Sequence, residues 1–290
     1  MEHIEKYTEH VKKMEYSNIK SYNDFFRIDT NEPLYIVEGI NINPDAKTVS
    51  LTDDHDKGVD FSLVNNPVYD KYKNYDVISI FKRSKLVDNT NTPRDGNPFI
   101  HALKGKKGWK FDITNQEIFR YIRRFLEICK KINNTYDTIV ITPSSTNLNE
   151  RFMEVISKQV KAENVIREFL VKIKKEEIID DDLIDKEQIT KDYPDNYNEV
   201  ISKISRSFRR MEGADFEAKS MDKEYLKYIK YIGVNNDVDI RPMMDDKDIL
   251  LLDDTISSGS TVSQCIEGIT SNFTPKSITI VTLLSQLKEN

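Results

Sequence analysis

The strongest hydrophobic pattern in the chain is the unbroken apolar run Ile249–Leu252, which ends in two aspartates, Asp253 and Asp254. A short continuous apolar run is typical of a strand buried on both faces of a parallel sheet. A loop of small hydroxyl residues follows, and apolar residues then recur at helical spacing over residues 261–266. The pattern predicts a strand, a polar loop and a helix, in that order.

Further strands and helices alternate before and after this stretch. Thr114 and Glu117 form a capping-box pattern, and the apolar residues that follow them keep to one helical face. Apolar strands are predicted within residues 137–143, 165–173 and 277–284, with another helix after Asn147. Strands that alternate with helices predict an α/β domain with a central, mostly parallel sheet and flanking helices.

The first part of the chain carries β patterns of its own. Residues 34–40 and 48–51 flank the turn residues Asn43, Pro44 and Asp45, and they predict a hairpin. A further strand is predicted at residues 76–81. These strands indicate a small β-rich unit ahead of the α/β domain.

Residues 88–98 are dense in turn formers and predict a domain boundary. We therefore expect a β-rich domain at residues 1–97, whose first 16 residues have a weak helical pattern, and a second domain at residues 98–290 with a charged insertion at about 174–235. The first domain is the more compact candidate for a lid, while dimerisation and partner binding stay open as alternatives. A chain that begins near Pro98 is expected to keep its own sheet.

Composition narrows the class of protein. At 290 residues the chain can bury a full core, and its net charge of −6 gives no overall basic field that would favour nucleic acid as a partner. No apolar run has the length of a membrane-spanning helix, and the first residues lack the apolar segment of a signal peptide. Cys129 and Cys265 lie in apolar helical patterns, so we interpret them as buried hydrophobic residues of a cytoplasmic protein.

One polar cluster invites a metal interpretation. His55 lies among Asp53, Asp54 and Asp56, which are residue types that bind metal ions. Such clusters are more often solvated loops, and we favour that interpretation here.

The candidate chemistry lies in the loop after Asp254. The N-terminus of a helix favours an anion, and Gly259 allows the tight turn that a phosphate cradle needs. Ser257, Ser258, Ser260 and Thr261 add hydroxyl donors. The two aspartates suit a ligand that has vicinal hydroxyls beside its phosphate, namely a ribose 5-phosphate, with a divalent cation that offsets the charge. The alternative is a βα turn in which Asp and Ser residues only cap a helix.

The whole string from Asp253 to Thr261 resembles the phosphoribosyl-pyrophosphate motif of type I phosphoribosyltransferases. In that motif an apolar strand leads into Asp-Asp, two variable residues, Thr-Thr-Gly-x-Thr and a helix. Here Asp253-Asp254-Thr255-Ile256-Ser257-Ser258-Gly259-Ser260-Thr261 follows it, with two Thr-to-Ser exchanges that keep the hydroxyls. The resemblance implies the type I phosphoribosyltransferase fold. It also implies that residues 255–261 bind the 5-phosphate, and that Asp253 and Asp254 serve the ribose hydroxyls, Mg²⁺ and catalysis.

Residues 99–287 are similar, more broadly, to the competence-protein F group of phosphoribosyltransferase-like proteins. The stretch Ile100–Gly105, the helix after it, the short strand ending in proline and serine, and the last strand occur in the same order. Only the motif around Asp253 is specific by itself. The two cysteines cannot build the zinc module with which that group usually opens, and its arginine-rich first loop is reduced to Arg151.

The resemblance implies a second loop that faces the diphosphate. Pro143, Ser144, Ser145 and Thr146 follow the strand at residues 137–143 and fit this position. Because these residues carry no positive charge, the leaving group would be poorly neutralised unless Lys104, Lys106 or Arg209 reaches it. Arg209 and Arg210 are candidates for a mobile loop that closes the site, although a surface helix end is the simpler interpretation.

These patterns favour a cytoplasmic phosphoribosyltransferase that binds phosphoribosyl pyrophosphate or a nucleoside 5′-monophosphate with Mg²⁺. It would transfer the phosphoribosyl group to or from a nucleobase. One alternative is a non-catalytic protein that senses phosphoribosyl pyrophosphate or a nucleotide. Another is a DNA-uptake accessory protein, and a homodimer also stays open. The sequence does not identify the acceptor base.

Overall fold

The computed structural model describes most of the chain after residue 37. The described residues are 38–53, 58–83, 97–180, 183–211, 216, 218–222, 224–235 and 240–285. Three sequence predictions lie outside them: the helical pattern of residues 1–16, the cluster around His55 and most of the turn-rich stretch 88–98.

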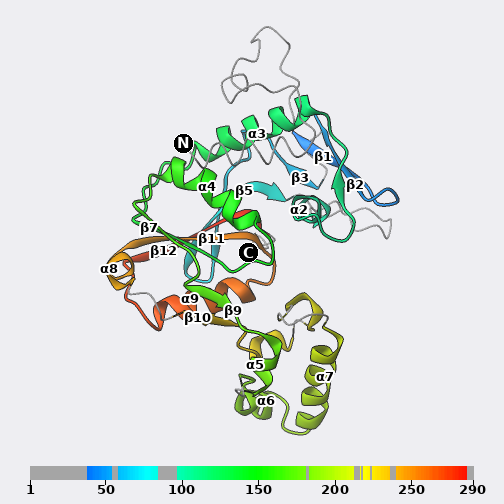
Figure 1. Cartoon of the computed structure of the whole chain (residues 1–290), viewed down its shortest axis with the longest axis vertical. Coiled ribbons are helices and arrows are strands. Elements are labelled where there is room, and N and C mark those ends of the chain that lie inside the picture. The colour runs from blue at the N-terminus through cyan, green and yellow to red at the C-terminus, as the bar shows by residue number, and fades with distance from the viewer. Residues whose placement is uncertain are drawn as a thin grey trace.

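A seven-stranded mixed sheet forms the centre of the molecule (Figure 1). Its parallel part consists of β5 (Tyr75–Arg83), β12 (Ser277–Ser285), β11 (Asp248–Ile256), β7 (Thr138–Ile141) and β8 (Asn164–Ile166), in that spatial order. The antiparallel strands β3 (Val59–Asp60) and β4 (Val68–Tyr72) both pair with β5. The predicted α/β class is confirmed.

Strand β11 shows why the apolar run predicted a strand with two buried faces. Ile249 and Leu251 belong to the hydrophobic cluster on one face of the sheet, and Leu250 and Leu252 belong to the cluster on the other. All four side chains are fully buried. Successive side chains of a strand point to opposite faces, so a continuous apolar run satisfies both layers at once.

Helices cover both faces of the sheet. On one face lie α2 (Asn97–Leu103), α3 (Asn115–Cys129) and α4 (Leu148–Val160), and on the other lies α9 (Ser260–Thr270) (Figure 1). The short helix α8 (Arg241–Met244) precedes β11. The predicted capping box of α3 is confirmed, because Thr114 and Glu117 each bind the backbone N–H of the other.

The connections leave the sheet in opposite directions at β7 and β11. From β7 the chain passes through α4 and returns as β8, on the side away from β11. From β11 it passes through α9 and returns as β12, on the side away from β7. Such a switch in strand order opens a crevice at the carboxyl ends of the two strands, where α/β proteins bind their ligands.

The N-terminal strands differ from the expectation of a separate domain. The predicted hairpin is confirmed as β1 (Gly39–Asn43) and β2 (Thr48–Thr52), and the predicted strand at residues 76–81 lies within β5. However, β5 pairs with β12 inside the central sheet, and β2 pairs with β6 (Lys110–Phe111) from beyond residue 97. A domain boundary at residue 97 would therefore cut through both sheets, since each contains strands from both sides of that residue. The apolar strand β5 is buried by pairing with β12, from the far end of the chain.

An aromatic cluster joins the same two parts of the chain. The ring of Phe81 lies 4.6 Å from that of Phe61, 6.2 Å from that of Phe99 and 5.8 Å from that of Phe125, measured between ring centroids. Phe61, Phe81 and Phe99 are fully buried. Without residues 38–83, these rings and one edge of β12 would lose their partners, so we expect a chain that begins near Pro98 to have a less stable core.

The insertion at residues 174–235 is helical and packs against the core. It contains α5 (Lys175–Asp180), α6 (Lys186–Asp192), α7 (Tyr197–Arg210), the 3₁₀ turns η1 (Ala218–Ser220) and η2 (Leu226–Tyr228), and the strand β10 (Ile232–Val234). β10 pairs with β9 (Leu170–Lys172), so the strand predicted at residues 165–173 is divided between β8 and β9.

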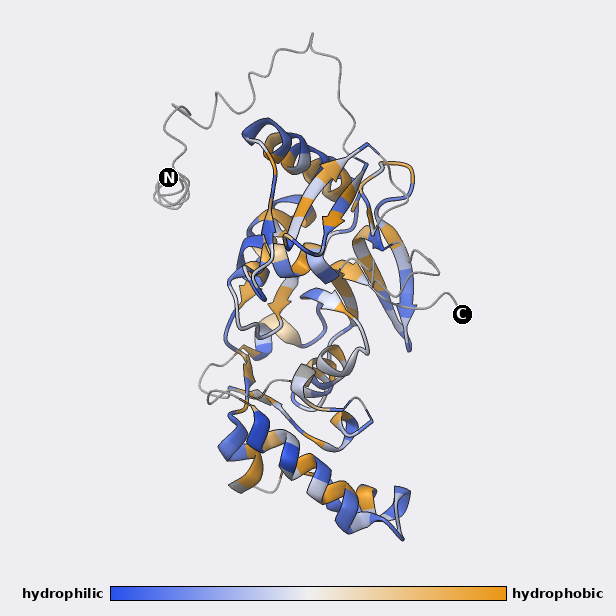
Figure 2. Cartoon of the chain, turned by 90° about the vertical axis from the view of Figure 1, so that its right-hand side faces the viewer, coloured by the Kyte–Doolittle hydropathy of each residue, from blue (hydrophilic) through white to orange (hydrophobic). Residues whose placement is uncertain are grey.

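The helices of the insertion form a lobe beyond the sheet (Figures 1 and 2). Their charged faces point outward, while Ile189, Ile204 and Phe208 are buried and extend the hydrophobic cluster of the sheet. The charge-rich pattern thus belongs to amphipathic helices rather than to a solvated loop, because their few apolar residues share one face.

None of the helices in the described residues is both long and apolar enough to span a membrane.

We expect Phe81→Ala to destabilise the whole chain in a single transition. Removal of a buried Phe ring costs about 3–5 kcal/mol, and Phe81 contacts rings on both sides of residue 97. Differential scanning calorimetry should show one transition that moves to lower temperature, whereas Tyr69→Ala, at an exposed position of the neighbouring strand β4, should hardly move it. Two transitions, of which only one shifts, would instead indicate two domains.

Candidate functional site

A cavity of about 420 Å³ lies at the carboxyl ends of β7 and β11, at the switch in strand order. Four parts of the chain line it: the end of β11 with the start of α9, the loop after β7, the turn after α2, and residues of the insertion with β9. The loop after β7 and the loop after β11, which the sequence analysis assigned to one ligand, both line this cavity.

Strand β11 extends further than the sequence predicted. The apolar run ends at Leu252, but the strand continues to Ile256, so Asp253 and Asp254 lie within it. Asp253 and Asp254 are both buried, with 8% and 5% of their surface exposed. The strand continues because its neighbour β12 is equally long and pairs with it as far as Ser285.

Gly259 is the N-cap residue of α9 and has a φ of +75°. A Cβ at this position would lie 2.3 Å from the ring of Tyr72, whose hydroxyl donates a hydrogen bond to the Gly259 carbonyl at 3.1 Å. The glycine is thus required by its left-handed φ and by the close approach of the ring. The sequence analysis missed Tyr72, because the residue lies 187 positions away, at the end of β4.

Two side chains attach the first turn of α9 to the insertion. The Tyr231 hydroxyl donates to Ser260 Oγ at 3.0 Å, and burial raises the pKa of this tyrosine. The amide oxygen of Gln264 accepts the backbone N–H groups of Tyr231 and Ile232, and its nitrogen donates to the Ile229 carbonyl. The serine loop, residues 257–261, is therefore held by Tyr72 on one side and by the insertion on the other.

The two aspartates have different partners. Asp253 Oδ1 accepts a 2.7 Å hydrogen bond from Thr142, the residue directly after β7, and Asn149 donates to the same threonine. Asp254 Oδ2 lies 2.6 Å from Lys104 Nζ, and Asp254 Oδ1 accepts a hydrogen bond from Thr255. Burial, together with the charge of Asp254, raises the pKa of Asp253 to about 7.

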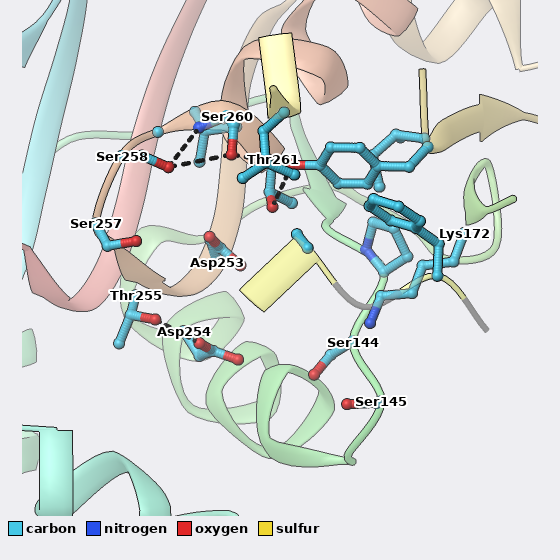
Figure 3. A pocket seen from close by; sticks show the side chains of 18 of the residues that line it. Ser144, Ser145, Lys172, Asp253, Asp254, Thr255, Ser257, Ser258, Ser260 and Thr261 are labelled. Carbon is cyan, nitrogen blue, oxygen red and sulfur yellow. Dashed lines mark hydrogen bonds between the residues drawn. The ribbon is translucent and has the colours of Figure 1, made fainter. Parts of the chain in front are cut away.

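Lysines reach the cavity from two segments. Lys104 and Lys106 belong to the turn after α2, and Lys172 is the last residue of β9. Lys106 Nζ donates to Ser145 Oγ at 2.6 Å, and the side chain of Lys172 extends toward Ser144 (Figure 3). The uncharged loop after β7 is thus accompanied by positive charge from elsewhere in the chain, and Lys172 is a site residue that the sequence analysis missed.

The structure brings most of the predicted site residues together. The predicted residues that line the cavity are Pro143, Ser144, Ser145, Asp253, Asp254, Thr255, Ser257, Ser258, Gly259, Ser260 and Thr261. Ile256 is buried in the core, and Thr146 lies behind Ser144, to whose oxygen its backbone N–H donates. Arg209 is exposed in the last turn of α7 and does not line the cavity.

An apolar wall completes the cavity. It consists of Phe216, Ala218, Met221, Leu226 and Ile232, all from the insertion. The rings of Phe216 and Tyr231 are stacked, with centroids 4.9 Å apart. No described residue between 38 and 83 lines the cavity, so the wall comes from the insertion and not from the β-rich segment that was one candidate for a lid.

The predicted metal site offers little to a resident cation. Mg²⁺ requires six oxygen ligands in near-octahedral geometry. Over the described ranges, no three His, Cys, Asp or Glu side chains are grouped so that they could hold a metal ion. Both oxygens of Asp254 already have partners, one of them an ammonium group. A magnesium ion on this carboxylate pair would therefore compete with the ammonium group of Lys104 for Asp254.

The cavity offers a distinct chemical surface at each end. Ser258, Ser260 and Thr261 lie on one side of Asp253, and Ser144, Ser145 and Lys172 lie on another (Figure 3). Apolar side chains of the insertion complete the lining. Neither a known protein-family model nor a curated protein matches the chain. A ligand that fills this cavity would carry anionic groups, hydroxyls and an apolar part.

Asp253 predicts a pH dependence of stability. Its pKa is about 7 in the folded protein against an ordinary value of 3.8, so between these values only the folded state holds the proton. In this range the free energy of unfolding therefore falls as the pH rises, until Asp253 is also ionised in the folded protein above about pH 7. Relative to the wild type, Asp253→Asn should gain stability from about pH 5 to about pH 7.5 in urea unfolding.

Asp248→Asn is the matched control, at the other end of the same strand. Hydrogen bonds from Lys276 and Ser277 lower the pKa of Asp248, so its titration lies below this pH window. Its stability difference from the wild type should stay constant over that window. If the free energies of unfolding of Asp253→Asn and the wild type instead changed in parallel with pH, Asp253 would be ionised in the folded protein over the whole window.

Proposed function

We propose that the chain binds phosphoribosyl pyrophosphate or a nucleoside 5′-monophosphate in this cavity, and that it transfers the phosphoribosyl group to or from a nucleobase. The observation that carries the proposal is the meeting of two loops at the switch in strand order. The serine loop, defined as residues 257–261, and the pair Asp253 and Asp254 line one cavity with Ser144 and Ser145. This is the arrangement that the resemblance to type I phosphoribosyltransferases implies.

The 5-phosphate is assigned to the serine loop. Residues 257–261 contribute four hydroxyl groups, and the last two of these residues form the start of α9. The first N–H groups of a helix have no acceptor within the helix and attract an anion. The bracing by Tyr72 and Tyr231 holds these donors in place before the ligand arrives, which lowers the entropy cost of binding.

The diphosphate is assigned to the loop after β7. Ser144 and Ser145 supply hydroxyls there, and Lys106 and Lys172 supply the positive charge that the loop itself lacks. Magnesium enters this proposal as the counter-ion of the ligand's own diphosphate. The ribose then lies between the two phosphate groups, with its hydroxyls near Asp253 and Asp254.

The apolar wall is the natural place for a nucleobase. Phe216, Met221 and Leu226 offer flat and flexible apolar surface, and aromatic rings stack well on such surfaces. In this proposal the insertion takes the role of a hood over the base. The side chains of the wall are apolar, so they offer a stacking surface that accepts more than one base.

The reaction needs no covalent bond to the protein. The bond between ribose C1 and the diphosphate oxygen breaks, and diphosphate leaves with the electron pair. A nitrogen of the base forms the new bond to C1 and releases its proton to solvent. Positive charge develops on the ribose ring, where the carboxylates lie, and negative charge develops on the diphosphate, near the lysines. Catalysis then rests on positioning and on electrostatic stabilisation.

Gly259→Val is expected to abolish nucleotide binding. The substitution places side-chain atoms where the Tyr72 ring lies and forces a β-branched residue to a φ of +75°, so the serine loop must move. Calorimetric titration with adenosine 5′-monophosphate should show at least about a 100-fold loss of affinity, or about 2.7 kcal/mol.

Gly108→Val controls for the cost of a valine at positive φ. Gly108 has a φ of +74°, lies outside the cavity, and has only Lys47 within ordinary contact distance of its Cβ position. This variant should bind the nucleotide as the wild type does. Unchanged affinity in Gly259→Val would remove the serine loop from the proposal.

Turnover separates an enzyme from a sensor. We expect diphosphate release when the protein is incubated with phosphoribosyl pyrophosphate, Mg²⁺ and a mixture of nucleobases, with a nucleotide as the second product. Lys172→Met should lower the rate by about 100-fold, because a charge that stabilises the leaving group is lost. Lys174→Met, at an exposed position outside the cavity, is the control. Tight binding of phosphoribosyl pyrophosphate without diphosphate release would indicate the sensor.

A further inference from the structure

The ion pair between Lys104 and Asp254 lies inside the cavity rather than on the surface. Lys104 Nζ is 2.6 Å from Asp254 Oδ2, and the two side chains are only 18% and 7% exposed. Both residues line the cavity. Water screens a pair with so little exposure only weakly, so the attraction between the two charges is stronger than in a surface pair.

The turn that carries Lys104 is fixed by the end of α2. The backbone N–H of Lys104 donates to the Ile100 carbonyl at 3.0 Å, and that of Lys106 donates to the His101 carbonyl at 2.8 Å. Helix α2 is itself anchored in the core by Phe99 and Ile100, which are buried. The ammonium group is therefore delivered by a rigid part of the fold and is in place before any ligand binds.

This ammonium group already contacts one of the carboxylate oxygens that a cation bound to the pair would use. Asp254 Oδ2 faces Lys104, Asp254 Oδ1 accepts from Thr255, and Asp253 Oδ1 accepts from Thr142. A divalent cation on this pair would have to displace the lysine or approach it closely against charge repulsion. With Lys104 in place, an anionic ligand meets carboxylates whose charge is already partly offset.

We propose that Lys104 is the built-in counter-cation of the carboxylate pair, so that the cavity binds the ribose phosphate part of its ligand without a divalent metal ion. This inference rests on the proposed function and deepens it. Metal then serves only a diphosphate, and a ligand with a single phosphate needs none.

The test uses ribose 5-phosphate as the probe, because it carries the ribose hydroxyls and one phosphate and lacks a diphosphate. Calorimetric titrations of the full chain are carried out in EDTA and in excess Mg²⁺. We expect the two dissociation constants to agree within about twofold. This comparison uses the wild-type protein, so it does not depend on whether any variant folds.

Substitution of Lys104 then tests the residue itself. Lys104→Met should weaken the binding of ribose 5-phosphate in EDTA by at least about tenfold, and Mg²⁺ should restore part of the loss, because the ion can now reach the carboxylates. Lys104→Arg keeps the charge and should bind without metal even if Lys104→Met fails to fold. Lys107→Met removes the same charge from an exposed position in the same turn and should bind as the wild type does.

The outcomes distinguish this inference from the proposed function. Binding by the wild type in Mg²⁺ but not in EDTA would overturn the inference and leave the proposed function standing. Unchanged, metal-independent binding by Lys104→Met would do the same, because the lysine would then have no part in it. No binding in either buffer would overturn the proposed function, and this inference with it.

Discussion

Two adjacent carboxylates in a buried strand are the constraint around which this cavity is arranged. Asp253 and Asp254 follow one another in β11, where successive side chains alternate in direction, so each has a hydrogen-bonding partner of its own. Asp254 is paired with Lys104 from the turn after α2, and Asp253 is hydrogen-bonded to Thr142 from the end of β7. Removal of one partner from such a buried pair typically costs about 3–5 kcal/mol. Folding is therefore coupled to the assembly of these three segments.

The serine loop is built on a similar principle. A loop that presents hydroxyls and backbone N–H groups to a ligand cannot bury them, so it must be held from outside the cavity. Tyr72 holds Gly259 from the side of β4, while Tyr231 and Gln264 hold the first turns of α9 from the side of the insertion. The donors that face the cavity stay available, and the loop is nevertheless positioned by side chains from distant parts of the chain.

The insertion has a larger part in this molecule than its composition suggests. Its helices bury apolar side chains against the core, and its last residues form the apolar wall of the cavity. The β-rich segment at residues 38–83, in contrast, completes the central sheet through β5 and contributes Tyr72 behind the serine loop. The candidate lid thus completes the sheet and the insertion forms the wall, because a hairpin pattern does not reveal which sheet its neighbouring strands will join.

Local patterns were sufficient for the elements and for the two loops of the site. The apolar run before Asp253 identified β11, the capping box at Thr114 identified the start of α3, and small hydroxyl residues around Gly259 identified the loop before α9. These features depend on residues a few positions apart, so they can be read from the chain directly. The same motif identified Asp253 and Asp254 as site residues, because they directly precede the serine loop in the chain.

What only the tertiary structure decided is which distant residues meet at that motif. Lys104, Lys172, Tyr72, Tyr231 and Phe216 reach it from separate elements. Their presence depends on the order of strands in the sheet and on the packing of the insertion, and both are set by long-range burial rather than by local sequence. A lysine in a glycine-rich turn looks like any solvated lysine until the fold places a buried carboxylate 2.6 Å from its nitrogen.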